Sequence, residues 1–119
     1  MENQNFLLYK GANYNLVFFV DDLPNLEDYT FTWVMGSSST PGSSIVITKT
    51  SAASQIVIDS INRQVTIKLL NADLDYTTGP AAGEYWHEVW GTFTGDSPNP
   101  NRPIATGIIT LRDSTRYNT

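Results

Sequence analysis

The 119-residue sequence predicts an all-β protein, an immunoglobulin-like antiparallel β-sandwich of about eight strands in a single domain, residues 1–119. Hydrophobicity alternates with a period of two along most of the chain, and no stretch sustains a helical period. Short runs rich in β-branched and aromatic residues are separated by Gly, Pro, Asn, Asp and Ser, which is typical of strands joined by turns. The length suits one domain, and no internal repeat divides it.

Eight segments have the length and composition of strands. In chain order they are Asn5–Lys10, Tyr14–Val20, Tyr29–Met35, Ser44–Thr50, Gln55–Asp59, Gln64–Leu70, Glu84–Phe93 and Ile104–Arg112. Alternation places Phe31 and Trp33 on the inward face of the third segment. Two stretches rich in Gly, Ser and Pro, Gly36–Ser44 and Gly95–Pro103, are expected to be exposed loops.

The charge balance narrows the choice of partners. A net charge of −5 and a pI near 4.5 argue against nucleic-acid backbones and anionic membranes. The chain has no cysteine, so it forms no disulfide and no thiolate metal site, and no cofactor is expected. The first residues lack a basic and then apolar stretch, so we expect no secretory signal. The longest apolar run, Leu16–Val20, is too short to cross a bilayer.

Several segments, in their order and spacing, carry a family resemblance. They are Phe6-Leu-Leu-Tyr-Lys-Gly, Leu16-Val-Phe-Phe-Val, Leu26-Glu-Asp-Tyr-Thr-Phe-Thr-Trp, Ile56-Val-Ile-Asp, Arg63-Gln-Val-Thr-Ile-Lys-Leu, Leu74 through Gly83-Glu-Tyr85, and Gly107-Ile-Ile-Thr-Leu-Arg-Asp-Ser-Thr-Arg116. Over roughly residues 6–116 the chain resembles the small β-sandwich domains of tailed-bacteriophage virion proteins, including the N-terminal domain of baseplate upper proteins. The resemblance implies a structural or adaptor role without catalysis. It also implies a place in the virion, after synthesis in the cytoplasm of an infected bacterial host, with other virion proteins and copies of itself as partners.

Tyr85 is predicted to form a tyrosine corner. It stands in Gly83-Glu84-Tyr85, at the start of a strand that follows the turn Leu70–Leu74. In a tyrosine corner the hydroxyl bonds back to the backbone upstream and stabilises a connection between the two sheets. This role is structural.

The sequence offers no convincing catalytic or metal site. The family resemblance implies that the Tyr85 face of this strand lies inside, so the single histidine, His87, is expected to be a satisfied or edge-of-core residue and not a general base. Glu84 and Glu88 lie four residues apart on one strand, roughly 13 Å, too far for a glycosidase pair. Asp73, Asp75, Thr77 and Glu84 match part of a calcium-loop spacing, but Thr78 replaces the required glycine. We therefore predict no enzyme, no metal and no cofactor.

Two tryptophans on one strand invite a functional interpretation. If Tyr85 and His87 point inward, Trp86, Glu88 and Trp90 point outward. Outward tryptophans are unusual unless something covers them. Three alternatives remain for what covers these: another protein subunit, the chain's own loop, or a stacked sugar ring.

The loop after this strand extends the candidate interface. It contributes Asp96, Pro98, Pro100, Arg102 and Pro103, and its prolines reduce the entropy lost when a partner binds. A solvated loop without a partner is an equal alternative. The leading functional prediction is a virion protein that works by assembly. The runner-up is a carbohydrate-binding or host-adhesion module in which the tryptophans form a sugar platform.

Overall fold

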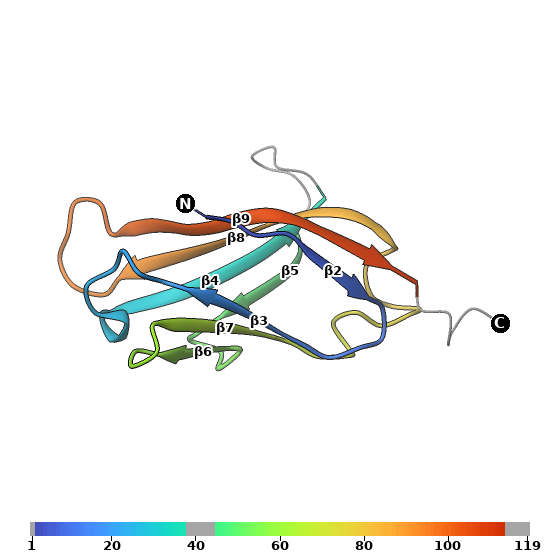
Figure 1. Cartoon of the computed structure of the whole chain (residues 1–119), viewed down its shortest axis with the longest axis horizontal. Helices are drawn as coiled ribbons and strands as arrows, with labels where there is room; N and C mark the ends of the chain where they lie inside the picture. Colours follow the sequence, from blue (N-terminus) through green and yellow to red (C-terminus); the bar gives the residue numbers. More distant parts are fainter. Residues whose placement is uncertain (1, 38–44, 114–119) are drawn as a thin grey trace.

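The computed structural model describes residues 2–37 and 45–113, and it shows two β-sheets packed face to face (Figure 1). The larger sheet has the order β1-β9-β8-β4-β5, and β2 also pairs with β9. The smaller sheet has the order β3-β7-β6. The strands are β1 (Glu2–Asn3), β2 (Phe6–Tyr9), β3 (Tyr14–Phe19), β4 (Tyr29–Gly36), β5 (Ile45–Thr50), β6 (Ile56–Asp59), β7 (Gln64–Leu69), β8 (Gly83–Phe93) and β9 (Asn101–Arg112).

Each of the eight predicted segments corresponds to one strand, and three details differ from the prediction. The two-residue strand β1 was not predicted, because a strand that short leaves no alternation to detect. Strand β9 begins at Asn101, three residues before the predicted start, so the predicted loop Gly95–Pro103 is shorter and Pro103 lies within a strand. In the predicted loop Gly36–Ser44, Gly36 is buried at the end of β4, and residues 38–44 lie outside the described residues.

The first strands run parallel to the last, whereas the other strand pairs are antiparallel. Phe6 pairs with Ile109 and Leu8 with Leu111, and β1 continues this parallel pairing from Glu2 opposite Ala105. Between β1 and β2 the chain passes close over Gly107, where a Cβ atom would lie 1.9 Å from the Gln4 carbonyl oxygen. Only glycine allows this approach.

The core follows from the alternation within each strand. Inward side chains of the two sheets meet in one continuous cluster that runs from Leu8 near the start to Leu111 near the end. Trp33, Phe18 and Phe31 are its largest fully buried members. Burying a side chain of this size contributes about 2 kcal/mol or more to folding. Both ends of the chain therefore contribute to the same core.

Candidate functional site

The outer face of the larger sheet carries the predicted tryptophans. On β8 the side chain of Trp86 is 38% exposed, and Glu88 and Trp90 are half-buried on the same face. His87 and Val89 alternate with them and are buried in the core. The strand thus presents Trp86, Glu88 and Trp90 outward, as the alternation predicts.

Trp90 is partly held by its own chain. Its indole Nε1 donates a hydrogen bond of 2.8 Å to Glu88 Oε2. Across the sheet it pairs with Pro103, the residue that the sequence had placed in the loop. Intramolecular cover therefore applies in part to Trp90, while Trp86 makes no such hydrogen bond among those described and stays the more open of the two.

Trp86 belongs to a wider apolar surface that the sequence analysis missed. Ile108 of β9 lies directly opposite Trp86, and Leu7 and Tyr9 of β2 continue the same side of the sheet. Leu7 is 48% exposed and Tyr9 42%. We call Leu7, Tyr9, Trp86 and Ile108 the Trp86 face. Part of this surface could have been predicted, since alternation in Phe6-Leu-Leu-Tyr turns Leu7 and Tyr9 away from the core. That β2 lies on the same sheet as β8, with β9 between them, follows only from the topology.

The structure does not join the loop residues to the tryptophans as one surface. Asp96 and Pro98 are exposed and Pro100 is half-buried in the β8–β9 connection, at one end of the sandwich. Arg102 is opposite Gly91, whose Cα faces the Phe31 ring, and so lies on the other side of the sheet from Trp86. Only Pro103 is next to a tryptophan.

Tyr85 makes the bond that defines a tyrosine corner. Its hydroxyl donates to the carbonyl oxygen of Ala81, four residues upstream, at 2.5 Å. The ring is partly buried and packs against the core. The bond ties the loop before β8 to the strand.

His87 is fully engaged in the core. It is 1% exposed, its Nδ1 accepts a 3.1 Å hydrogen bond from Trp33 Nε1, and its Nε2 lies 2.7 Å from the Gln4 carbonyl. These partners assign the neutral tautomer with the proton on Nε2. Burial lowers the pKa of His87, while the Gln4 hydrogen bond and the Glu88 charge partly oppose that shift. A histidine so enclosed cannot reach a substrate.

The two aspartates of the calcium-like spacing have other partners. Asp73 forms an ion pair with Lys49 at 2.7 Å. Asp75 accepts hydrogen bonds from the backbone and hydroxyl groups of Thr77 and Thr78, which lower its pKa to about 2. Among the described residues no group of three or more His, Asp or Glu could hold a metal.

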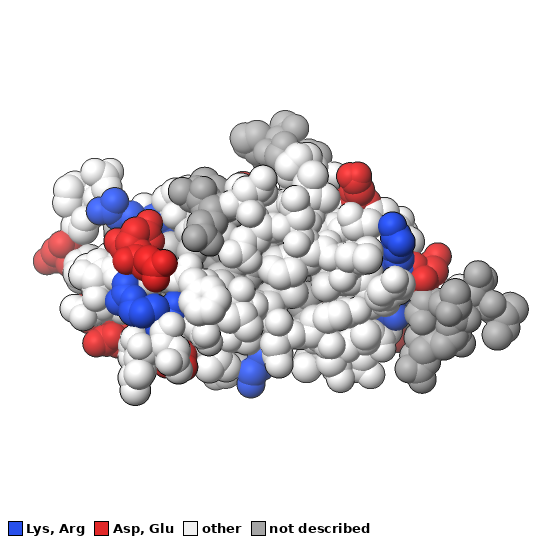
Figure 2. Space-filling view, in the orientation of Figure 1, with Lys and Arg blue, Asp and Glu red and all other residues white. Residues whose placement is uncertain are grey.

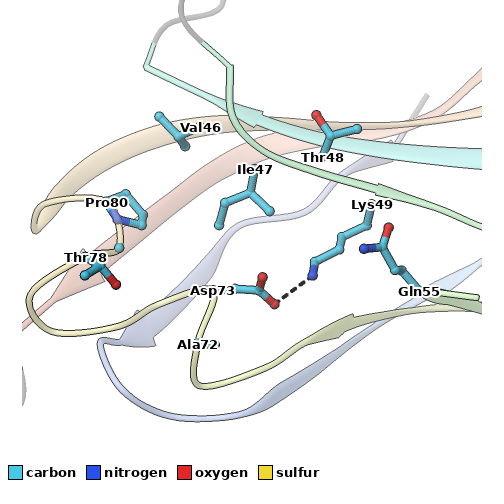
Figure 3. Close-up of a pocket in the computed structure, with 10 residues that line it drawn as sticks. Val46, Ile47, Thr48, Lys49, Gln55, Ala72, Asp73, Thr78 and Pro80 are labelled. Carbon is cyan, nitrogen blue, oxygen red and sulfur yellow. Dashed lines mark hydrogen bonds and ion pairs between the residues drawn. The ribbon is translucent and has the colours of Figure 1, made fainter. Parts of the chain in front are cut away.

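A polar pocket of about 510 Å³ lies between β5 and the loop 72–80 (Figure 3). Its walls include Val46, Thr78 and Pro80, and the Lys49–Asp73 pair spans its floor. Because each charge already neutralises the other, the pocket presents no unpaired charge from this pair to a ligand. The Lys49–Asp73 pair was not predicted from the sequence.

Charged side chains gather toward the two ends of the molecule in the view of Figure 2. Between them lies a broad, mostly uncharged area, where Figure 1 draws β3 and β7. The described part of the chain contains no helix long and apolar enough to span a membrane.

The architecture defines an immunoglobulin-like β-sandwich domain, as the sequence predicts. It is similar to the solved extracellular domain of the voltage-gated sodium channel beta4 subunit, whose parallel homodimer structures explain its role in cell–cell adhesion. The TM-score is 0.51 and the identity 17%, over 96% of this chain and 94% of the other. No family model matches the sequence, and no curated protein matches it.

The immunoglobulin-like core is built without its usual disulfide. In antibody domains a disulfide joins the two sheets, and its second cysteine follows the corner tyrosine by two residues. Here His87 takes that position after Tyr85, and its ring centroid lies 5.9 Å from Phe18 of the opposite sheet and 6.2 Å from Trp33. Phe6 completes the cluster at 5.6 Å from His87. Aromatic packing thus joins the sheets where a covalent bond would.

Proposed function

We propose that this chain is a non-enzymatic structural or adaptor domain of a bacteriophage virion, located in the particle and working through protein–protein contacts. The observation that carries the assembly role is the Trp86 face, an exposed apolar surface on the outer side of the larger sheet. Trp and Tyr are enriched among the residues that dominate binding energy in protein interfaces. The order of sequence segments shared with virion β-sandwich domains supports the place of action.

Two further observations favour binding over catalysis. The only histidine is enclosed in the core. Asp59 and Asp75 accept hydrogen bonds within turns, Asp73 forms an ion pair, and Glu88 accepts the Trp90 indole hydrogen bond. The beta4 domain, which shares the fold, acts in adhesion through homodimers. Self-association is therefore one mode that we propose for this chain, alongside contacts with other virion proteins.

Solution mass tests the assembly role of the Trp86 face. We expect size exclusion with light scattering to show an oligomer of the wild type, and Trp86→Ala to lower the measured mass by removing the contacts made through this face while the protein stays folded. Trp86 is preferable to Trp90 as the target because the Trp90 indole also stabilises the sheet through Glu88. Thr30→Ala, on the same sheet away from Trp86, is a matched control that should keep the mass. A monomeric wild type would remove self-association through this face.

The virion location has its own test. Peptides of this chain should copurify with intact phage particles from the source host, in a constant ratio to a major capsid protein, through density-gradient separation. Their presence only in the lysate, separated from particles, would overturn the virion proposal and leave the Trp86 face to another partner.

Carbohydrate binding is the alternative function, and the exposure of Trp86 between Glu84 and Glu88 on β8 favours it. A sugar ring could stack on the indole while the carboxylates accept its hydroxyl groups. Glycan-array binding that Trp86→Ala abolishes, with a monomeric wild type, would select this function over assembly.

A further inference from the structure

The outer face of the smaller sheet is a second apolar surface, on the opposite side of the sandwich from Trp86. Val17 and Phe19 of β3 are 37% and 54% exposed, and Val57 of β6 is 44% exposed. Val17, Thr66 and Val57 form one row across the three strands, since Val17 and Val57 both pair with Thr66 of the central strand β7. We call all the outward residues of β3, β7 and β6 the small-sheet face. They are Asn15, Val17, Phe19, Val57, Asp59, Gln64, Thr66 and Lys68.

The charges of this face are placed at its two ends. Two residues beyond Thr66 in one direction lies exposed Lys68, opposite Asn15. Two residues in the other direction lies the row of Phe19, Gln64 and Asp59. Hydrogen bonds from Asn62 lower the pKa of Asp59, so it is ionised at neutral pH. The face is therefore basic at one end and acidic at the other.

Exposed apolar residues flank both ends. Leu70, 57% exposed, follows Lys68 on the outward side of the chain, and Ile61, 91% exposed, lies in the turn after Asp59. Along β7, from the Leu70 end to the Ile61 end, the face is therefore apolar, basic, apolar at its centre, acidic and apolar again. A second copy of the face that runs in the opposite direction places its acidic end over the basic end of the first.

We propose that the small-sheet face binds the same face of a second copy of this chain, with the two β7 strands antiparallel. A two-fold axis through the Thr66 row superposes rows that lie two residues, or about 7 Å, to either side. Lys68 then lies over Gln64 of the second copy and beside its Asp59. Leu70 lies over the turn that carries Ile61 of the second copy.

The charges select this orientation over a parallel one. If the two β7 strands ran parallel, Lys68 would face Lys68 of the second copy, and Phe19 would lie over Asp59. Like charges directly opposite each other are destabilising, and burying a carboxylate under an aromatic ring removes water from the charge without giving it a partner. The antiparallel arrangement forms two Lys68–Asp59 pairs and keeps the valines at the centre.

The size of the face sets the expected affinity. Three strands are only about 14 Å wide. The contact is therefore well below the roughly 800 Å² per partner of a standard stable interface. We expect a weak dimer that forms at high local concentration, where many copies are held together and multivalency adds to its strength. The inference uses the sheet opposite the Trp86 face and does not rest on the proposed function.

Sedimentation velocity from about 10 µM to about 1 mM, a range that brackets micromolar to millimolar dissociation constants, tests the dimer. The experiment uses the Trp86→Ala background, so that association through the other face does not contribute. We expect the sedimentation coefficient to rise with concentration toward that of a dimer. Phe19→Ser should abolish the rise, and Leu7→Ser, a change at a similarly exposed apolar residue on the other sheet, should keep it.

Charge reversal tests the orientation. Lys68→Glu should weaken dimerisation at least tenfold, and Gln64→Lys should weaken it by placing a second cation near Lys68. The double variant Lys68→Glu/Gln64→Lys should recover the dimer, because the new pair forms across the two-fold axis. The Tm of each variant is also measured, and only variants that keep the parent's Tm are compared, which separates loss of association from loss of fold.

Two results would overturn the proposal. A Trp86→Ala protein that stays monomeric at about 1 mM, a concentration that would reveal even millimolar affinity, would show that the small-sheet face does not self-associate. A dimer lost in Phe19→Ser but not recovered by the double charge variant would place the interface correctly and refute its antiparallel orientation.

Discussion

At the scale of single residues, the arrangement around His87 connects the core to pH. Its Nδ1 can accept the Trp33 hydrogen bond only while it carries no proton, so protonation would set two donors against each other in a buried site. Gln4 reaches Nε2 because Gly107 lets the N-terminal segment pass close to β8 and β9. The hydrogen bonds of Trp33 and Gln4, two residues distant from His87 in sequence, therefore both depend on one neutral imidazole.

We predict that this makes stability depend on pH near neutrality. The pKa of His87 is lowered in the folded protein, so the unfolded chain binds a proton first as the pH falls below about 6.5, and the free energy of unfolding decreases. The slope should approach at most about 1.4 kcal/mol per pH unit for one proton. Urea unfolding between pH 7.5 and 5 measures it.

His87→Gln is the control, because its amide can accept from Trp33 and donate to Gln4 without ionising. The chain has no other histidine, so the slope in this pH range should disappear in the variant. An unchanged slope would assign the pH dependence to another group.

At the scale of elements, β5 forms a free edge of the larger sheet and turns a charge inward. Lys49 is 5% exposed, and Asp73, which it pairs with, also accepts a hydrogen bond from the Leu70 backbone N–H. An inward charge on an edge strand discourages pairing with the edges of other molecules. The pair also fastens β5 to the loop that follows β7.

Removing the Asp73 carboxylate alone should cost more stability than removing both charges of this pair. We expect Asp73→Ala to destabilise the protein by about 3 kcal/mol, because Lys49 remains buried without its counter-charge. Lys49→Met/Asp73→Ala should recover most of that loss, and Lys49→Met alone should cost about 1 kcal/mol or less. A double-mutant cycle from urea unfolding gives the coupling energy. Additive effects would mean that the pair does not stabilise the fold.

The elements also show how far sequence reasoning reaches. Alternation put Trp86 and Trp90 on one face of their strand and His87 on the other, and the family resemblance chose the inward face, which burial confirms; Gly83-Glu84-Tyr85 predicted the upstream backbone bond, which Tyr85 makes to Ala81. Contacts between strands were not accessible in this way. The pairing of Lys49 with Asp73 breaks the rule that inward positions are apolar, and the row that joins Leu7 to the tryptophan strand depends on a parallel pairing that local patterns do not encode.

At the scale of the whole molecule, the two candidate binding faces lie on opposite sides of one sandwich whose extents are 53 × 30 × 23 Å. A protein with two independent faces can contact a neighbour on each side, so copies can extend into layers or chains. A two-fold contact through the small-sheet face closes on a pair of copies, and only a second contact through the Trp86 face would link such pairs into larger assemblies. The aromatic centre that replaces a disulfide keeps both sheets together in this arrangement.

The parallel pairing of β2 with β9 has a mechanical consequence. The start of β1 and the end of β9 lie at opposite ends of one hydrogen-bonded ladder, which extends from Glu2 opposite Ala105 to Tyr9 opposite Arg112. Tension applied at these two points would load the ladder in shear, so many bonds must break together. Attachment at Glu84 and Asp113, at the open end of the β8–β9 pair, would instead unzip bonds one after another. We therefore expect single-molecule pulling to require a higher force in the first geometry than in the second.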